Sequence, residues 1–153
     1  MDLRSFTERL VSFDTTEGRE AEAASWFHEQ LDALGFETYE WTADAAVLAE
    51  HPSFPDDPAA IDTENRPSVA GVLEVGDPDA GRTFVLNGHL DVVPGDEGAW
   101  SSAPFEPEWG EEDGAETLTA RGAVDMKAPL AACNTDRRDT SVESDAGFIV
   151  SSS

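Results

Sequence analysis

Apolar residues recur at helical spacing in the first 35 residues of the chain. Leu3, Phe6 and Leu10 fall on one face of a helix that follows Asp2, a residue type that caps helix N-termini. A second apolar stripe, over residues 17–34, ends at a glycine, as helices commonly do. The pattern therefore predicts two amphipathic helices at the start of the chain.

Strand-like segments follow these helices. They alternate apolar and polar residues or are rich in Val and Leu, and they cover residues 36–42, 68–75, 82–87 and 116–120. Prolines in residues 43–67, and the Gly, Pro and acidic residues of 94–115, predict loops between them. A further helix is expected to begin at Met126. Helices before and after Val-rich strands indicate an α/β layered domain with a mostly parallel sheet.

The charge of the chain is strongly acidic. Nine basic residues against 33 acidic ones give a formal net charge of −24, and the acids are spread along the sequence. Binding of nucleic acid through phosphates is excluded, because it requires basic patches. A solvated acidic surface would account for this charge, but we favour adaptation to molar salt, where self-repulsion is screened within about 3 Å.

Other compositional features narrow the class of protein. A length of 153 residues suits one folded domain, and the single cysteine, Cys133, cannot form an internal disulfide. The longest apolar run, residues 45–49, is far shorter than a membrane span, and the N-terminus does not have the pattern of a secretory signal. We therefore expect a cytoplasmic protein without membrane partners.

Two segments carry residues that suit a metal site. Residues 88–94 read Gly-His-Leu-Asp-Val-Val-Pro and follow an apolar strand. On extended backbone His89 and Asp91 face the same side, so the carboxylate can orient a metal-binding imidazole while Leu90 points into the core. A His-x-Asp pair arises by chance with a probability of order ~0.3 in such a composition, so a surface histidine near an acid remains an alternative.

The second segment, residues 121–127, reads Arg-Gly-Ala-Val-Asp-Met-Lys. Asp125 stands where a helix is expected to begin, so it is either an N-terminal cap or a carboxylate that bridges two metal ions. The sequence also leaves open whether Lys127, the only lysine, pairs with nearby carboxylates or belongs to an active site.

Taken together, these segments carry a resemblance to a known family. Between them stand Trp100 and the Pro-Phe-Glu-Pro of residues 104–107. The run 82–127 resembles the metallohydrolases that include acetylornithine deacetylase, succinyl-diaminopimelate desuccinylase, aminoacylases and carboxypeptidase G-like enzymes. Gly-His-x-Asp-x-Val-Pro, Trp with Pro-Phe-x-Pro, and Gly-Arg-Gly-x-x-Asp-Met-Lys occur in that order in this family.

The resemblance implies a function and a site. It implies hydrolysis of amide bonds in N-acyl amino acids or small peptides, with two zinc ions per site, or cobalt. His89 matches a ligand of one metal, Asp125 matches the carboxylate that bridges both, and Asp91 matches the catalytic-site acid that orients the histidine. In such enzymes a glutamate general base helps to deprotonate the attacking water.

Departures from the family pattern limit what this chain is expected to do. Ala128 and Pro129 replace the usual glycine, and a proline is tolerated in the first turn of a helix. The glutamate pair that the family carries some 30 to 35 residues after the bridging aspartate has no counterpart, since Glu143 comes too early and stands alone. The later ligands are missing as well.

We therefore expect part of a three-layer catalytic domain over residues 1–133, without its C-terminal half and without the lid domain through which relatives dimerise. Residues 134–153 are expected to be a non-matching, disordered tail. Such a chain would bind zinc weakly and be inactive alone. The alternative is a non-enzymatic partial domain that binds a metal weakly or binds a partner chain.

Overall fold

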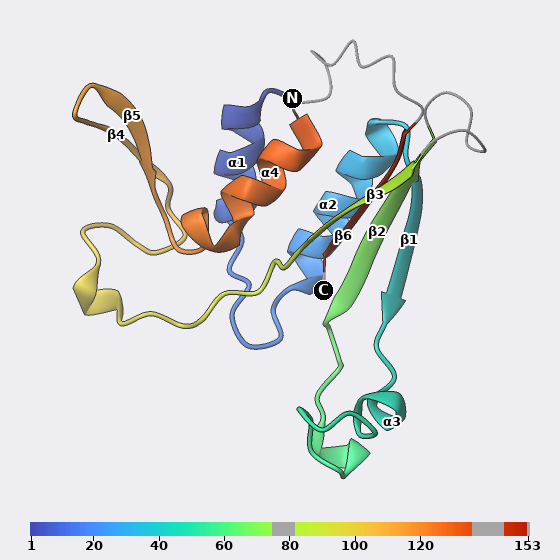
Figure 1. The fold of residues 1–153 in the computed structure, drawn as a ribbon. Helices are drawn as coiled ribbons and strands as arrows, with labels where there is room; N and C mark the ends of the chain where they lie inside the picture. The colour runs from blue at the N-terminus through green and yellow to red at the C-terminus, as the bar shows by residue number, and fades with distance from the viewer. Residues whose placement is uncertain (75–81, 136–145, 153) are drawn as a thin grey trace.

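The computed structural model describes residues 1–74, 82–135 and 146–152. Its main elements form a four-stranded sheet, three longer helices and a separate two-stranded hairpin (Figure 1). The helices are α1 (Leu3–Val11), α2 (Ala21–Ala33), α3 (Ala45–Leu48) and α4 (Ala128–Thr135). The strands are β1 (Glu37–Thr42), β2 (Pro67–Leu73), β3 (Arg82–Gly88), β4 (Glu108–Glu112), β5 (Ala115–Thr119) and β6 (Ala146–Ser152).

The two N-terminal helices form where the apolar spacing predicts them. Asp2 caps α1, since its carboxylate accepts a hydrogen bond from the Ser5 backbone N–H at 2.8 Å. Helix α2 begins later than expected, because Glu17 and Gly18 adopt positive φ angles that no α-helix contains. Gly35 follows its C-terminus with φ +86°, the left-handed conformation that ends many helices.

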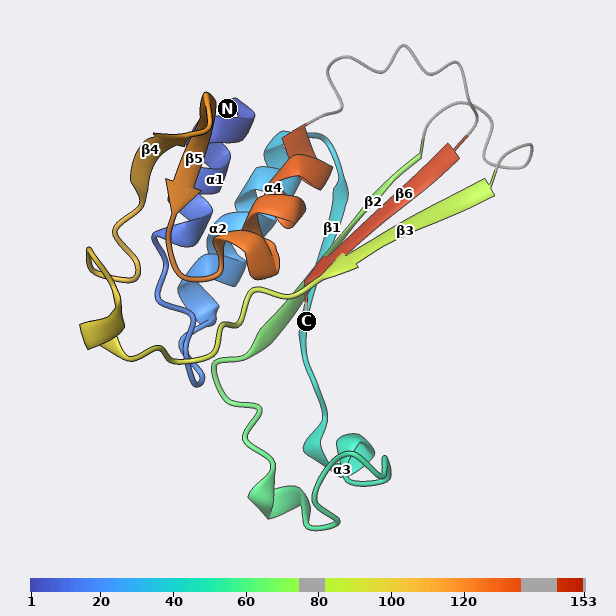
Figure 2. The ribbon, with the colours of Figure 1, turned by 60° about the vertical axis from the view of Figure 1, so that its left-hand side comes forward.

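The core lies between the helices and one face of the sheet. Helices α1, α2 and α4 stand together on that face in Figures 1 and 2. Fully or almost fully buried side chains come from all of these layers: Phe6, Leu10, Phe27, Leu31, Val69, Leu90 and Leu130. The described residues thus form a helical layer and a sheet, while the third layer of the expected architecture remains a prediction.

The expectation of a mostly parallel sheet is wrong for the described strands. The order is β1-β2-β6-β3, with β1 antiparallel to β2, β2 antiparallel to β6, and β6 parallel to β3. Parallel neighbours need a long crossover, usually through a helix. Among the described parts of the connections between strands, a longer helix, α4, lies only between β3 and β6. Strands β1 and β2 are joined by the projecting segment 43–66, whose α3 is a single turn (Figure 2).

The second sheet is a hairpin whose first strand falls within residues 94–115, where the composition predicts a loop. Strands β4 and β5 pair antiparallel, from Glu108 opposite Thr119 to Glu112 opposite Ala115. Their two-residue turn is Asp113-Gly114, and both residues have positive φ. An Asp-Gly pair is a strong hairpin signal, and the acidic composition of residues 108–112 concealed it.

The C-terminal segment also departs from expectation. Residues 146–152 form β6 between β2 and β3, although a disordered tail was expected over 134–153. The apolar run in this segment, residues 148–150, is too short to show a strand periodicity, and pairing with two neighbouring strands decides its conformation. The rest of that expectation falls largely on residues 136–145 and 153, which lie outside the described residues, as does Glu143.

Within the described residues, no helix combines the length and apolar character that crossing a bilayer requires.

Candidate metal site and pocket

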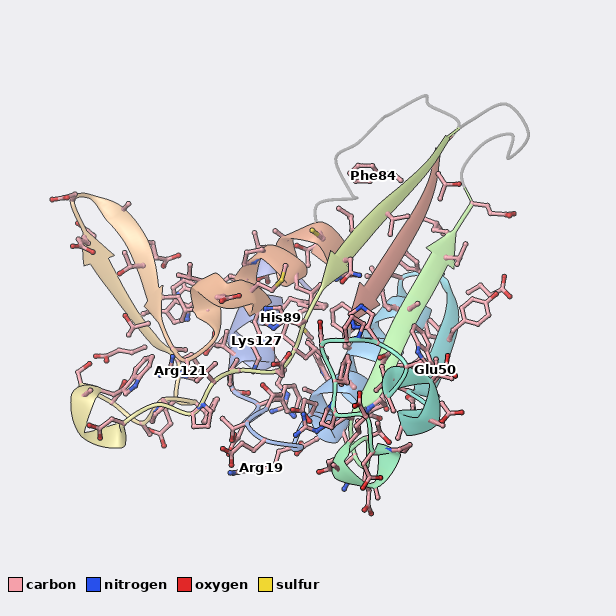
Figure 3. The ribbon with its side chains drawn as sticks, turned by 60° about the horizontal axis from the view of Figure 1, so that its bottom comes forward. Arg19, Glu50, Phe84, His89, Arg121 and Lys127 are labelled. Carbon is pink, nitrogen blue, oxygen red and sulfur yellow. The ribbon has the colours of Figure 1, made fainter. Side chains whose placement is uncertain are left out.

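Three segments that are distant in the sequence meet beyond the end of β3. They are residues 88–94, the loop 13–16 after α1, and the wide turn Ala123–Lys127 before α4. In Figure 3, His89 and Lys127 lie close together below α4, and Arg121 lies nearer the hairpin. The sequence-predicted residues His89, Asp91 and Asp125 are all brought together here.

His89 contacts both predicted carboxylate residues. Its Nε2 lies 3.0 Å from Asp125 Oδ1. Its Nδ1 lies 3.0 Å from the Asp91 carbonyl oxygen and 3.2 Å from Asp91 Oδ1. An imidazole with its proton on Nδ1 donates to Asp91 and leaves the Nε2 lone pair for a metal ion beside Asp125. The two sides of the ring are therefore held by different acids.

The local backbone explains why the histidine and the acid share a side. Leu90 between them is 3% exposed and belongs to the core, as the alternation predicts. His89 and Asp91 have exposed fractions of 36% and 57% for their side chains. Burial alone would lower the pKa of the His89 imidazole, but Asp91 and Asp125 outweigh it and raise that pKa above its ordinary value.

Asp125 is not a helix cap. It has extended backbone angles, φ −123° and ψ 96°, and α4 begins three residues later at Ala128. The peptide bond between Asp125 and Met126 is cis. Gly122 starts the turn with φ +77° and has no side chain that could cap it. The carboxylate, with 85% of its side chain exposed, is therefore presented to solvent beside His89. Pro129 falls in the first turn of α4, where proline is tolerated.

The loop 13–16 joins the two site segments, a role that its sequence does not indicate. The Thr15 hydroxyl donates to the Leu90 carbonyl at 2.6 Å, and the Thr15 carbonyl accepts from the Val92 N–H at 3.2 Å. These two bonds hold Leu90 and Val92, the residues on either side of Asp91, against the loop. Thr15 is fully buried, and a lone threonine after a helix carries no sequence signal for such a contact.

Lys127 completes the connection from the other segment. Its Nζ donates to the Phe13 carbonyl at 2.9 Å and lies 5.7 Å from the centre of the Phe105 ring. The side chain is fully buried, and desolvation lowers its pKa to about 8, although Asp14 and Asp91 oppose that shift. The sequence left open whether this lysine pairs with carboxylates or belongs to an active site. Among the described residues it makes no ion pair, and it instead ties loop 13–16 to the turn that carries Asp125.

A pocket of about 280 Å³ opens at these residues. Its lining is made of residues 89, 91–93, 100 and 120–125. The predicted metal ligands line the pocket together with Trp100 and Arg121. These two residues belong to the family motifs, but the resemblance assigns no role to them. Within the residues that the structure describes, no group of three or more His, Cys, Asp or Glu side chains could hold a metal ion. His89 and Asp125 therefore form a fitting but incomplete donor set for zinc.

The chain has clear relatives among proteins of known sequence. Residues 85–134, which run from β3 to α4 and contain the pocket, match the model of peptidase family M20/M25/M40. The succinyl-diaminopimelate desuccinylase of Rhizorhabdus wittichii is 33% identical over 132 residues, which are 86% of this chain and 29% of the relative. That of Erythrobacter litoralis is 54% identical over 54 residues, 35% of this chain and 13% of the relative.

Solved structures show the same fold. A dipeptidase from Saccharomyces cerevisiae superposes with a TM-score of 0.70 at 20% identity, covering 98% of this chain and 31% of that one. An M20 family metallo-carboxypeptidase from Sulfolobus solfataricus superposes with a TM-score of 0.64 at 17% identity, covering 99% and 30%. The chain thus spans about a third, or less, of the length of these relatives. These findings support the interpretation that the chain corresponds to part of an M20-family metallohydrolase, whose family model it matches over residues 85–134.

Proposed function

We propose that this chain contributes the first part of an active site that hydrolyses amide bonds in N-acyl amino acids or small peptides. The observation that carries the proposal is the convergence of His89 Nε2 and Asp125 Oδ1 to 3.0 Å in a pocket, with Asp91 on the other nitrogen of the same ring. The desuccinylase and dipeptidase relatives support amide hydrolysis as the reaction class.

His89 and Asp125 would hold zinc or cobalt, and Asp91 would orient His89. Imidazole nitrogen and carboxylate oxygen are ordinary zinc ligands, and the acid on Nδ1 fixes the tautomer that leaves Nε2 available. A bound metal of this kind polarises the scissile carbonyl and lowers the pKa of a bound water. The contribution of this chain is to place the two ligand atoms and to keep the imidazole from rotating.

The ligand count sets what the chain can do by itself. A catalytic zinc site normally has three protein ligands and one open position, whereas His89 and Asp125 supply two. We therefore propose weak metal binding and no turnover for the isolated chain. Hydrolysis would require a glutamate base and further ligands, and general-base catalysis typically contributes 10²–10⁴-fold in rate. A site with two ligands is also compatible with the alternative of a non-enzymatic domain that binds a metal weakly.

A Co²⁺ titration of the full chain tests the metal site. Binding is followed by calorimetry and by visible absorption, for the unaltered chain and for His89→Ala, Asp125→Ala and the control His51→Ala. His51 is exposed and outside the pocket, so its loss should leave binding unchanged. We expect weak binding that both site substitutions abolish. Equal binding by all four proteins would refute the proposed ligands.

An activity assay separates the two functional accounts. The chain is incubated with N-acetyl amino acids, N-succinyl amino acids and dipeptides in molar KCl with added zinc or cobalt. We expect no detectable hydrolysis, because the base and later ligands are missing from the described residues. Metal-dependent turnover that disappears in His89→Ala would show that the site is complete without them.

We also propose a cellular location, a salt environment and a range of partners for this protein. The single cysteine suits a reducing compartment, so we propose a cytoplasmic protein. The net charge of −24 supports adaptation to high salt and argues against nucleic-acid partners. We propose no membrane partner.

A further inference from the structure

Arg121 stands out in the pocket because its charge is opposite to that of its surroundings. Between His89 and Asp125 it is the only arginine or lysine, in a stretch rich in acidic residues. It lines the same pocket as both proposed metal ligands and as Asp91. The pocket therefore has an acidic side, where a metal would bind, and a guanidinium elsewhere in its lining.

The guanidinium is held by groups that do not neutralise it. The backbone N–H of Arg121 donates to the Pro104 carbonyl at 2.7 Å, and the guanidinium carbon lies 4.9 Å from the centre of the Trp100 ring. Gly95 gives it room, because a Cβ at that position would lie 2.2 Å from Arg121 Nη2 and 3.1 Å from Trp100 Nε1. A stacked aromatic ring and a backbone without a side chain thus fix the position of the planar group.

Among the residues that the structure describes, none accepts a hydrogen bond from the side chain of Arg121. Its Nε is buried and has no hydrogen-bond partner, and no carboxylate of the described residues lies within ion-pair distance of the guanidinium. By contrast, Arg4 pairs with Glu116 and Arg19 pairs with Asp14. An unpaired, partly buried guanidinium in so acidic a chain calls for an anion, and its planar fork matches a carboxylate.

We propose that Arg121, stacked on Trp100, binds a carboxylate of the substrate while the amide bond lies at the His89 and Asp125 side of the pocket. This inference rests on the proposed function and names the residue that would recognise the free carboxylate that its substrates carry in addition to the scissile amide. N-acyl amino acids, N-succinyl amines and dipeptides all meet this condition, whereas neutral amides do not.

The side-chain Nε–H of Arg121 provides a direct readout by ¹H–¹⁵N NMR. The full chain is titrated with succinate in the presence of EDTA at constant ionic strength, and separately with neutral succinamide. We expect one arginine Nε–H resonance to shift saturably with succinate only, and that resonance to be missing from Arg121→Met. The matched control is Arg66→Met, because Arg66 also makes no ion pair with the described residues but lies outside the pocket.

Two further variants keep the test decisive if Arg121→Met does not fold. Arg121→Lys keeps the charge and the stem but lacks the Nε–H and the fork, so it identifies the resonance. Gly95→Ala retains Arg121 but places a methyl group in the space that its guanidinium occupies. It should therefore weaken succinate binding by about tenfold or more.

The outcomes separate this inference from the metal proposal. A resonance that does not shift, shifts equally with succinamide, or persists in Arg121→Lys would overturn the carboxylate site, even if Co²⁺ binds as expected. A saturable shift confined to succinate would support the carboxylate site even if Co²⁺ did not bind, in which case only the metal proposal fails.

Discussion

Replacing Gly122 by alanine should destabilise the chain by more than backbone strain alone. Gly122 has φ +77°, and a residue with a side chain in this region costs roughly 1–2 kcal/mol. A Cβ there would also lie 2.6 Å from Cγ1 of Val92, against an ordinary carbon–carbon contact of about 3.5–4.0 Å. Val92 is 7% exposed and β-branched, so it has little freedom to move away.

The expected cost can be divided into its two parts. Overlap with a packed neighbour typically costs about 1–3 kcal/mol, so Gly122→Ala should lower the free energy of unfolding by roughly 2–5 kcal/mol in total. Gly35→Ala is the matched control, since Gly35 has φ +86° and nothing within 4 Å of its added Cβ. It should show the strain alone, roughly 1–2 kcal/mol.

A double-mutant cycle with Val92→Ala isolates the overlap. Val92→Ala removes the clashing methyl group and by itself should cost about 1.6 kcal/mol, for two methyl equivalents at about 0.8 kcal/mol each. In that background Gly122→Ala should cost no more than Gly35→Ala does, which gives a coupling energy of about 1–3 kcal/mol. The measurement is urea unfolding in molar KCl, followed by circular dichroism for the unaltered chain and the four variants.

Two results would refute this reasoning. One is a Gly122→Ala cost equal to that of Gly35→Ala in the unaltered background, which would mean that Val92 does not press on this turn. The other is an excess cost that persists after Val92→Ala, which would place the overlap elsewhere, for example at Lys127, whose Cδ lies 3.3 Å from the added Cβ.

Three further predictions concern the loop, the buried lysine and the charge. Thr15→Val should lower the free energy of unfolding by about 1–3 kcal/mol and weaken Co²⁺ binding, because it removes a buried hydrogen bond to Leu90. The control Thr7→Val should lower the free energy of unfolding far less, since the Thr7 hydroxyl only duplicates the helical bond to Leu3. Equal urea midpoints for these two variants would contradict the prediction. The pKa of Lys127, about 8 in the fold against an ordinary 10.5, means that the unfolded chain binds more protons between these values. The free energy of unfolding should therefore rise from about pH 8 upward, by at most about 1.4 kcal/mol per pH unit. This rise should be lost in Lys127→Met. If the unaltered chain and Lys127→Met showed the same dependence of the free energy of unfolding on pH, Lys127 would not be its cause. Thermal midpoints should increase from low to molar KCl as repulsion among 33 acids is screened, and a flat or falling midpoint would argue against adaptation to salt.

The sequence by itself determined the elements whose signals are local. Helix α1 and the C-terminus of α2 follow from the apolar stripe, the Asp2 cap and Gly35, each of which acts within a few residues. The relation between His89 and Asp91 also follows from strand alternation, because both lie on one extended segment. Motif order then sufficed to indicate the metallohydrolase family.

Tertiary structure decided whatever depends on segments that are distant in the chain. The direction of the strands was misjudged because it is set by which strands become neighbours, and β6 enters between β2 and β3 from the far end of the sequence. The conformation of Asp125, outside any helix, depends on Gly122 packing against Val92 and on the bond from Lys127 to Phe13. Such contacts span up to 114 residues and carry no periodic signal.

The pocket shows the same division most clearly. The ligand types of His89 and Asp125 could be read from the motifs, but their approach to 3.0 Å is a property of the fold. Arg121 is an ordinary member of a motif in the sequence, and only the folded chain places its guanidinium against Trp100 without a carboxylate partner among the described residues. Local sequence determines which chemical groups are available. Packing between distant segments determines the distances between these groups and the environment of their charges, and both determine the chemistry of the site.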